Sequence, residues 1–94
     1  MLYKLYYSSQ FKRQYKKLHY SGRKRITVEL EKVIDLLVRG EKLPIKYRNH
    51  KLIGNLKDSY ECHIAPDWLL VYKVYENVLI LELVAMGNHG NLFK

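Results

Sequence analysis

The sequence has little cysteine and proline and no long apolar run. Among its 94 residues are two prolines and one cysteine, Cys62. One cysteine can neither form an internal disulfide nor supply the paired cysteines of a structural zinc site, so we expect Cys62 to be a small buried apolar side chain. No stretch is long enough to cross a bilayer, and the N-terminus lacks the apolar segment of a signal peptide. We therefore expect a cytoplasmic protein.

Acidic residues are missing from the first quarter of the chain. Residues 1–25 contain eight Lys or Arg and no Asp or Glu, whereas the remaining residues contain nine of each sign, so the net charge of +8 arises from residues 1–25. A one-sided basic field favours a polyanionic partner over a solvated helix face, which is the alternative. The residues predicted to contact RNA in this region are Lys12, Arg13, Lys16, Lys17, Arg23, Lys24 and Arg25.

The apolar pattern predicts one α+β domain over residues 1–94. Residues 2–7 are typical of a strand. Ser8 or Ser9 can cap a first amphipathic helix that ends near residues 20–22, and a second helix with an apolar stripe from Ile26 to Leu37 stops at Gly40. We expect both helices on one face of the sheet.

The second half of the chain predicts three further strands. Residues 41–49 form a loop that leads into residues 50–54, and alternating or continuous apolar residues predict strands at 60–65, 68–74 and 78–84. A glycine-containing tail covers residues 87–94. The expected order is an N-terminal strand, two helices and a mainly antiparallel meander of three strands.

Histidines are the residues in this sequence best suited to proton transfer. RNA can be cut without a metal when the ribose 2′-hydroxyl attacks the neighbouring phosphorus, which requires a base for that hydroxyl and an acid for the departing 5′-oxygen. Histidine fits either role because its ordinary pKa of about 6.5 lies near neutral pH. His50, His63 and His89 lie on three elements that a meander can bring together, whereas His19 stands apart.

Sequence context supports His50 and His63 in different ways. His50 alone is as well explained as a surface residue, but Arg48 and Lys51 place cations beside it, and we predict that both contact RNA. His63 follows the alternation of its strand and therefore shares a sheet face with Glu61. A solvated face is the alternative interpretation.

Three further residues near the C-terminal half are candidates. Asp67 follows a proline, and a hydrogen bond to its own turn explains it as well as a catalytic role does. His89 lies between two glycines and close to Phe93, an aromatic residue able to stack on an unpaired base. The chain has no phosphate-binding loop, serine elbow or His-Glu-x-x-His motif, and a site made from three histidines has no diagnostic metal spacing. No cofactor or metal is predicted.

Three stretches together resemble a known family. They are residues 47–58 with a loop histidine, residues 61–73 with a strand histidine, Pro-Asp and an apolar strand, and residues 87–93 with Gly-x-His and Leu-Phe. This combination resembles the YafQ branch of the RelE toxins, and the resemblance spans nearly the whole chain.

The resemblance implies a RelE-like toxin of a type II toxin–antitoxin system, a ribosome-dependent endoribonuclease that cleaves mRNA. It further implies that His50, His63, Asp67 and His89 handle protons, with His89 as the general acid, and that Phe93 contacts the RNA. The implied partners are the ribosome, its mRNA, and an antitoxin that covers the site. Operator DNA is bound only through the toxin–antitoxin complex.

Two positions depart from the family pattern. Tyr60 and Ala85 stand where the family usually has arginine. Two fewer cations near the scissile phosphate weaken transition-state stabilisation, a contribution often worth about 3 kcal/mol, unless Arg48, Lys51 or Lys73 substitutes. Two alternatives stay open: a weakened module that binds RNA or protein without cutting, and a relative of the gyrase-poisoning branch, against which the histidines argue.

Overall fold

The computed structural model describes residues 2–52 and 58–92. Its elements are β1 (Lys4–Tyr7), α1 (Ser9–Tyr20), α2 (Lys24–Val38), the short 3₁₀ helix η1 (Ile45–Tyr47), β2 (His50–Lys51), β3 (Ser59–Ala65), β4 (Trp68–Tyr75), β5 (Ile80–Gly87) and α3 (His89–Leu92). The predicted α+β order of a strand, two helices and a meander is confirmed.

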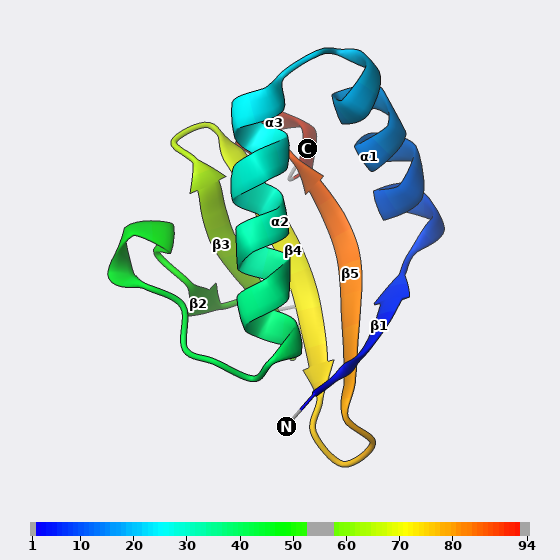
Figure 1. Cartoon of the computed structure of the whole chain (residues 1–94), viewed down its shortest axis with the longest axis vertical. Helices are drawn as coiled ribbons and strands as arrows, with labels where there is room; N and C mark the ends of the chain where they lie inside the picture. The colour runs from blue at the N-terminus through cyan, green and yellow to red at the C-terminus, as the bar shows by residue number, and fades with distance from the viewer. Residues whose placement is uncertain (1, 53–57, 93–94) are drawn as a thin grey trace.

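The strands form one five-stranded sheet in the order β1-β5-β4-β3-β2 (Figure 1). β1 runs parallel to β5, and the other neighbouring pairs are antiparallel. The strand β2 is an addition to the prediction, which left residues 50–54 without a strand. Two residues are too few to show alternation, and they are extended because β3 offers a partner.

Local signals in the sequence define both long helices. The Ser8 hydroxyl accepts a hydrogen bond of 2.9 Å from the Phe11 backbone N–H at the start of α1. Gly22 and Gly40 follow the two helices with φ of 74° and 72°, values that a residue without Cβ adopts at little cost. Both helices cover the same face of the sheet (Figure 1).

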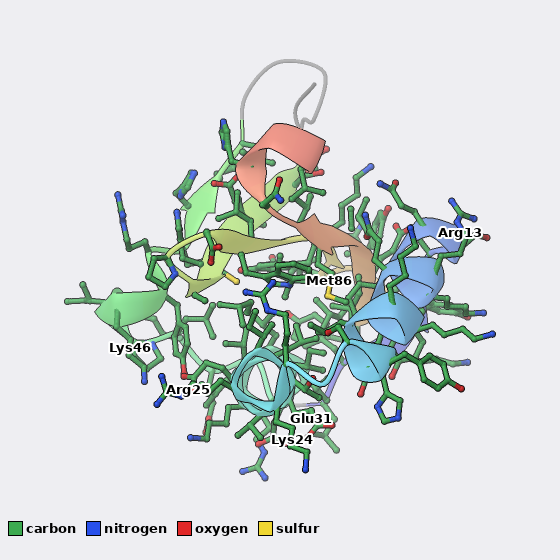
Figure 2. All side chains as sticks on the ribbon, turned by 90° about the horizontal axis from the view of Figure 1, so that it is seen from above. Arg13, Lys24, Arg25, Glu31, Lys46 and Met86 are labelled. Atoms are coloured by element: carbon green, nitrogen blue, oxygen red, sulfur yellow. The ribbon has the colours of Figure 1, made fainter. Side chains whose placement is uncertain are left out.

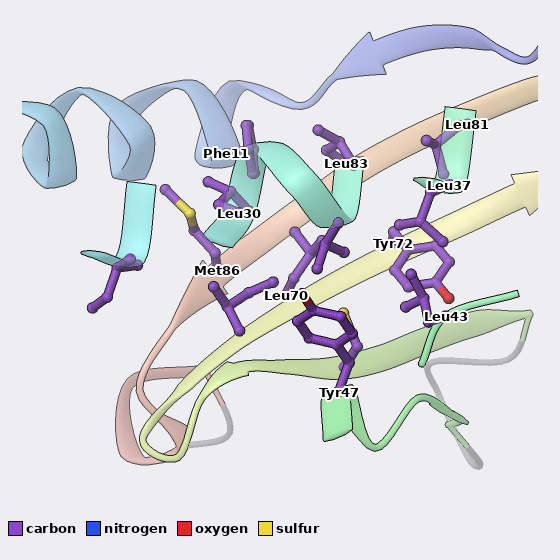
Figure 3. Close-up of a cluster of buried hydrophobic side chains, with 14 of the residues drawn as sticks. Phe11, Leu30, Leu37, Leu43, Tyr47, Leu70, Tyr72, Leu81, Leu83 and Met86 are labelled. Carbon is purple, nitrogen blue, oxygen red and sulfur yellow. The ribbon is translucent and has the colours of Figure 1, made fainter. Parts of the chain in front are cut away.

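The core lies between this face and the two helices (Figure 3). Leu30 and Val33 of α2 are fully buried, as are Leu70 of β4 and Leu81 of β5. Cys62 is also fully buried, and burial raises the pKa of its thiol to about 12. The prediction that Cys62 is a small buried apolar side chain is therefore confirmed.

The N-cap of α1 and a side chain within α1 cover the edge of β5 beyond the end of β1. β1 pairs with residues 80–83 only. Past that point the Ser8 hydroxyl donates to the Val84 carbonyl oxygen at 2.5 Å, and the Gln14 side-chain oxygen accepts from the Met86 backbone N–H at 2.8 Å. β5 therefore continues to Gly87, and the predicted bounds of 78–84 were wrong by two to three residues at each end.

The C-terminal segment after β5 begins a short helix instead of an irregular tail. The Leu92 backbone N–H donates to the Asn88 carbonyl oxygen, and the Leu92 side chain lies over Gly87. Phe93 falls outside the described residues. Within the described part of the chain, no helix is long and apolar enough to cross a membrane.

Candidate active site

The register of the sheet brings candidate residues from separate segments into one row. On the face away from α1 and α2, His50 of β2 lies opposite Glu61 of β3, Glu61 opposite Val71 of β4, and Val71 opposite Ala85 of β5. The neighbouring row on the same face begins with His63. Strand alternation predicted that His63 and Glu61 share a face, and the register confirms it.

Both ring nitrogens of His50 face hydrogen-bond acceptors. Nδ1 lies 2.9 Å from the Arg48 carbonyl oxygen, and Nε2 lies 3.4 Å from Oε1 of Glu61. A carbonyl oxygen can only accept, so Nδ1 is the donor in the first contact, and Nε2 lies against a carboxylate oxygen. Glu61 is only 6% exposed. His50 is therefore held between a backbone carbonyl oxygen and a buried carboxylate.

His63 has the opposite environment. Burial is the main reason that its pKa lies below the ordinary value for histidine, and the charge of Arg48 lowers the pKa further. Glu61 raises the pKa, while His50 and His89 lower it. The ring centroids of His63 and His50 are 6.4 Å apart, and Nδ1 of His63 is buried without a hydrogen-bond partner among the described residues. The lowered pKa favours the uncharged form of His63 at neutral pH.

Asp67 and His89 lie at the same end of the sheet as His63, whereas His19 lies away from it. Asp67 is exposed in the turn between β3 and β4, and His89 is exposed at the first residue of α3. His89 is close enough to His63 to influence its pKa. His19 lies on α1 against the edge of Tyr20, outside this cluster.

The two departures from the family pattern lie on different faces. Tyr60 stacks on Tyr72 with ring centroids 5.4 Å apart and packs against the core beneath the helices. An arginine at this position would therefore point away from His63. Ala85 lies in the row that contains His50, so the missing cation that matters is at that position. Lys51 follows His50 in β2 and points to the opposite face, so it is no substitute.

The basic residues predicted to bind RNA divide between two surfaces. Figure 2 shows Arg13 of α1 on one side of the molecule and Arg25 of α2 near Lys46 on another. The guanidinium of Arg23 lies 5.2 Å from the centre of the Trp68 ring. The exposed cations that remain together on α1 are Lys12, Arg13, Lys16 and Lys17, and they are called the α1 patch below.

A family model described as the bacterial toxin of type II toxin–antitoxin systems, YafQ, matches residues 3–94. The chain belongs to the YafQ toxin family. The family predicted from sequence is thereby confirmed, as is its place among the toxins of type II toxin–antitoxin systems.

Two curated relatives carry the name mRNA interferase toxin YafQ, which agrees with the predicted endoribonuclease class. The protein of *Escherichia coli* strain K12 is 39% identical over 51 residues, which span 54% of this chain and 53% of that protein. The protein of strain B / BL21-DE3 is 32% identical over 88 residues, 93% of this chain and 91% of the relative.

Solved structures of YafQ-like toxins share the fold. YafQ in the *E. coli* DinJ–YafQ toxin–antitoxin complex has a TM-score of 0.88 and 27% identity, with complete coverage of both chains. A metal-bound toxin from *Helicobacter pylori* has a TM-score of 0.88 and 39% identity, covering 99% of this chain and 100% of that one. In residues 2–52 and 58–92 of the present chain, no group of three His, Cys, Asp or Glu side chains is arranged to hold a metal ion.

Sequence reasoning assigned no role to two groups at this site. It placed Glu61 on the face of His63 but did not pair it with His50, because β2 was not recognised as a strand. Lys46 went unnoticed because its neighbours on the surface come from α2 and β3, far away in the sequence. The left-handed (αL) backbone of Arg48, with φ of 48°, is a further feature that the sequence pattern does not indicate.

Proposed function

We propose that this YafQ family member is a ribosome-dependent endoribonuclease that cleaves mRNA by acid–base chemistry without a metal. The observation that carries the proposal is the pairing of an uncharged His63 with a His50 ring whose two nitrogens face acceptors. An uncharged His63 can serve as a base, while the His50 ring, held in place by its two acceptors, can donate an N–H to the phosphate. The two relatives named mRNA interferase support the same class of reaction.

In the proposed reaction His63 takes the proton of the ribose 2′-hydroxyl. The 2′-oxygen forms a bond to the neighbouring phosphorus, and the bond between phosphorus and the 5′-oxygen of the next nucleotide breaks. His89 gives its proton to that leaving oxygen, so the products are a 2′,3′-cyclic phosphate and a 5′-hydroxyl. The low pKa of His63 keeps its ring ready to accept a proton at neutral pH.

The remaining candidates act on charge and position. His50 and Arg48 stabilise the negative charge that builds on the phosphate oxygens, an effect that is large where charges are fixed before the reaction begins. Asp67 orients the proton-transfer groups from its turn, and Phe93 stacks on a base of the message. The α1 patch contacts ribosomal RNA, away from the cleaved strand.

A cognate antitoxin is the proposed protein partner. The *E. coli* relative forms a complex with the antitoxin DinJ. An antitoxin that covers the histidine cluster would block RNA access, and we expect operator DNA to be bound through that complex only.

Growth arrest and mapped message cleavage after induction test the proposal. His63→Ala and His89→Gln should each fold and bind ribosomes but cut about 10²–10⁴-fold more slowly, the usual loss for a proton-transfer group. His19→Gln, which alters a histidine outside the cluster, should cut like the wild type. Growth arrest by the wild type without any cleaved message would instead favour a module that binds RNA or protein without cutting. The missing cation at Ala85 is the structural reason to consider this alternative.

A further inference from the structure

A groove of about 480 Å³ lies beside the histidine cluster, between α2, η1 and the end of β3. Its lining includes Arg25 and Glu29 of α2, Lys46 and Arg48 at η1, and His63 of β3. His63 therefore has one side toward His50 and Glu61 and another toward this groove. A substrate phosphate at the histidines would have its continuing chain directly at the groove.

Among the described residues that line the groove, the one carboxylate, Glu29, is paired with a cation. Glu29 accepts a hydrogen bond from the Tyr47 hydroxyl and lies 3.2 Å from the ammonium nitrogen of Lys46. The Tyr47 hydrogen bond is the main cause that lowers the pKa of Glu29, and Lys46 lowers it further. Glu29 therefore remains an anion paired with Lys46. The positive charge that is left in the groove comes from Arg25 and Arg48.

Neither of these two guanidinium groups is engaged within the described part of the chain. The ion pairs and side-chain hydrogen bonds of residues 2–52 and 58–92 include neither of them. Arg48 also connects the groove to the reaction site. Its carbonyl oxygen accepts a hydrogen bond from Nδ1–H of His50, and its charge lowers the pKa of His63.

We propose that the groove binds the phosphodiester group of the nucleotide next to the cleaved bond, with Arg25 as its contact and Arg48 between this group and the scissile phosphate. This inference rests on the proposed function, since it places the scissile phosphate at His63. Guanidinium groups suit phosphate oxygens because their planar donors bind two oxygens at once. Tyr47 is buried and engaged with Glu29, so no lining aromatic is free to stack a base. The groove therefore reads the backbone and not the base sequence.

The basic residues of the first quarter consequently serve two purposes. Arg25 belongs to the substrate groove, whereas the α1 patch lies on another side of the molecule (Figure 2). Lys24 precedes Arg25 in α2 and, although the charge pattern predicted an RNA contact for it, it does not line the groove. We therefore expect no contact between Lys24 and the flanking phosphate, and Lys24→Gln is a control of the same charge on the same helical turn.

The test compares two uncleavable RNAs that carry 2′-deoxyribose at the cleavage position. One is a dinucleotide with a single phosphate, and the other is a trinucleotide with a second, flanking phosphate. NMR titration at low salt gives the affinity of each. In the wild type and in Lys24→Gln the second phosphate should increase the affinity about tenfold, as expected for one charge-assisted contact. In Arg25→Gln that increase should be lost while dinucleotide affinity is kept.

Other outcomes overturn the groove proposal. Equal gains in Arg25→Gln and Lys24→Gln, or no gain in the wild type, mean that Arg25 does not bind the flanking phosphate. A loss of dinucleotide affinity in Arg25→Gln means that Arg25 contacts the scissile phosphate instead. Weaker antitoxin binding by Arg25→Gln with both titrations unchanged makes the groove a protein-binding surface. Because the titrations need no cleavage, an inactive wild type with the predicted affinities would reject the proposed function alone.

Discussion

Replacing Glu61 with glutamine would remove the charge that faces His50 and keep nearly the same side-chain volume. Nε2 of His50 and Oε1 of Glu61 are 3.4 Å apart. At this separation Coulomb's law gives about 1.2 kcal/mol in water and about 4.9 kcal/mol at an effective dielectric constant of about 20. The His50 side chain is 51% exposed, so the lower end applies. A loss of about 1.4 kcal/mol in transition-state stabilisation corresponds to about tenfold slower cleavage.

Single-turnover cleavage of message on stalled ribosomes measures this effect. Glu61→Gln should also move the acid limb of the pH–rate profile to lower pH, because Glu61 raises the pKa of His63. A residue with only a structural role would not shift that limb. The control is Glu82→Gln on β5, where the carboxylate accepts from the Tyr75 hydroxyl instead of facing a histidine. A Glu61→Gln protein with the wild-type rate and an unshifted limb would refute the role assigned to this pair.

Two further predictions concern charges elsewhere. His63 must be uncharged to accept a proton, so activity falls as the pH drops through the lowered pKa of His63. Arg48→Gln removes one cause of that lowering and should move the acid limb of the pH–rate profile to higher pH. An unmoved limb would show that Arg48 does not act on His63. Reversing Lys12, Lys16 and Lys17 to Glu should weaken ribosome binding and flatten its salt dependence; equal binding at every salt concentration would contradict the role of the α1 patch.

Much of the fold could be predicted because its signals are local. The Ser8 cap, the glycines after both helices and the apolar stripe of α2 each involve residues a few positions apart. β5 was harder, since its last residues are held by Ser8 and Gln14 from the other end of the chain. No pattern near residue 86 indicates that partner.

The candidate site was likewise predictable where local pattern decided the placement and unpredictable where distant segments meet. Strand alternation was enough to place His63 and Glu61 on one face, and the proton-transfer chemistry of histidine was enough to select His50, His63 and His89. Pairing of His50 with Glu61 required β2, which is extended only because β3 lies beside it. Tyr60 shows the converse, because its place in the family pattern suggested a role at the phosphate whereas its side chain stacks beneath the helices.

The sequence by itself determined the helices, the central strands, the buried cysteine and the excess of positive charge, because periodicity, caps and composition act over short stretches of chain. Tertiary structure alone decided which charges meet. It set Arg48 beside His63, gave His50 a buried carboxylate, and separated Arg25 from the α1 patch. Such contacts join residues distant in sequence, and their energies depend on separation and burial, which exist only once the sheet has paired.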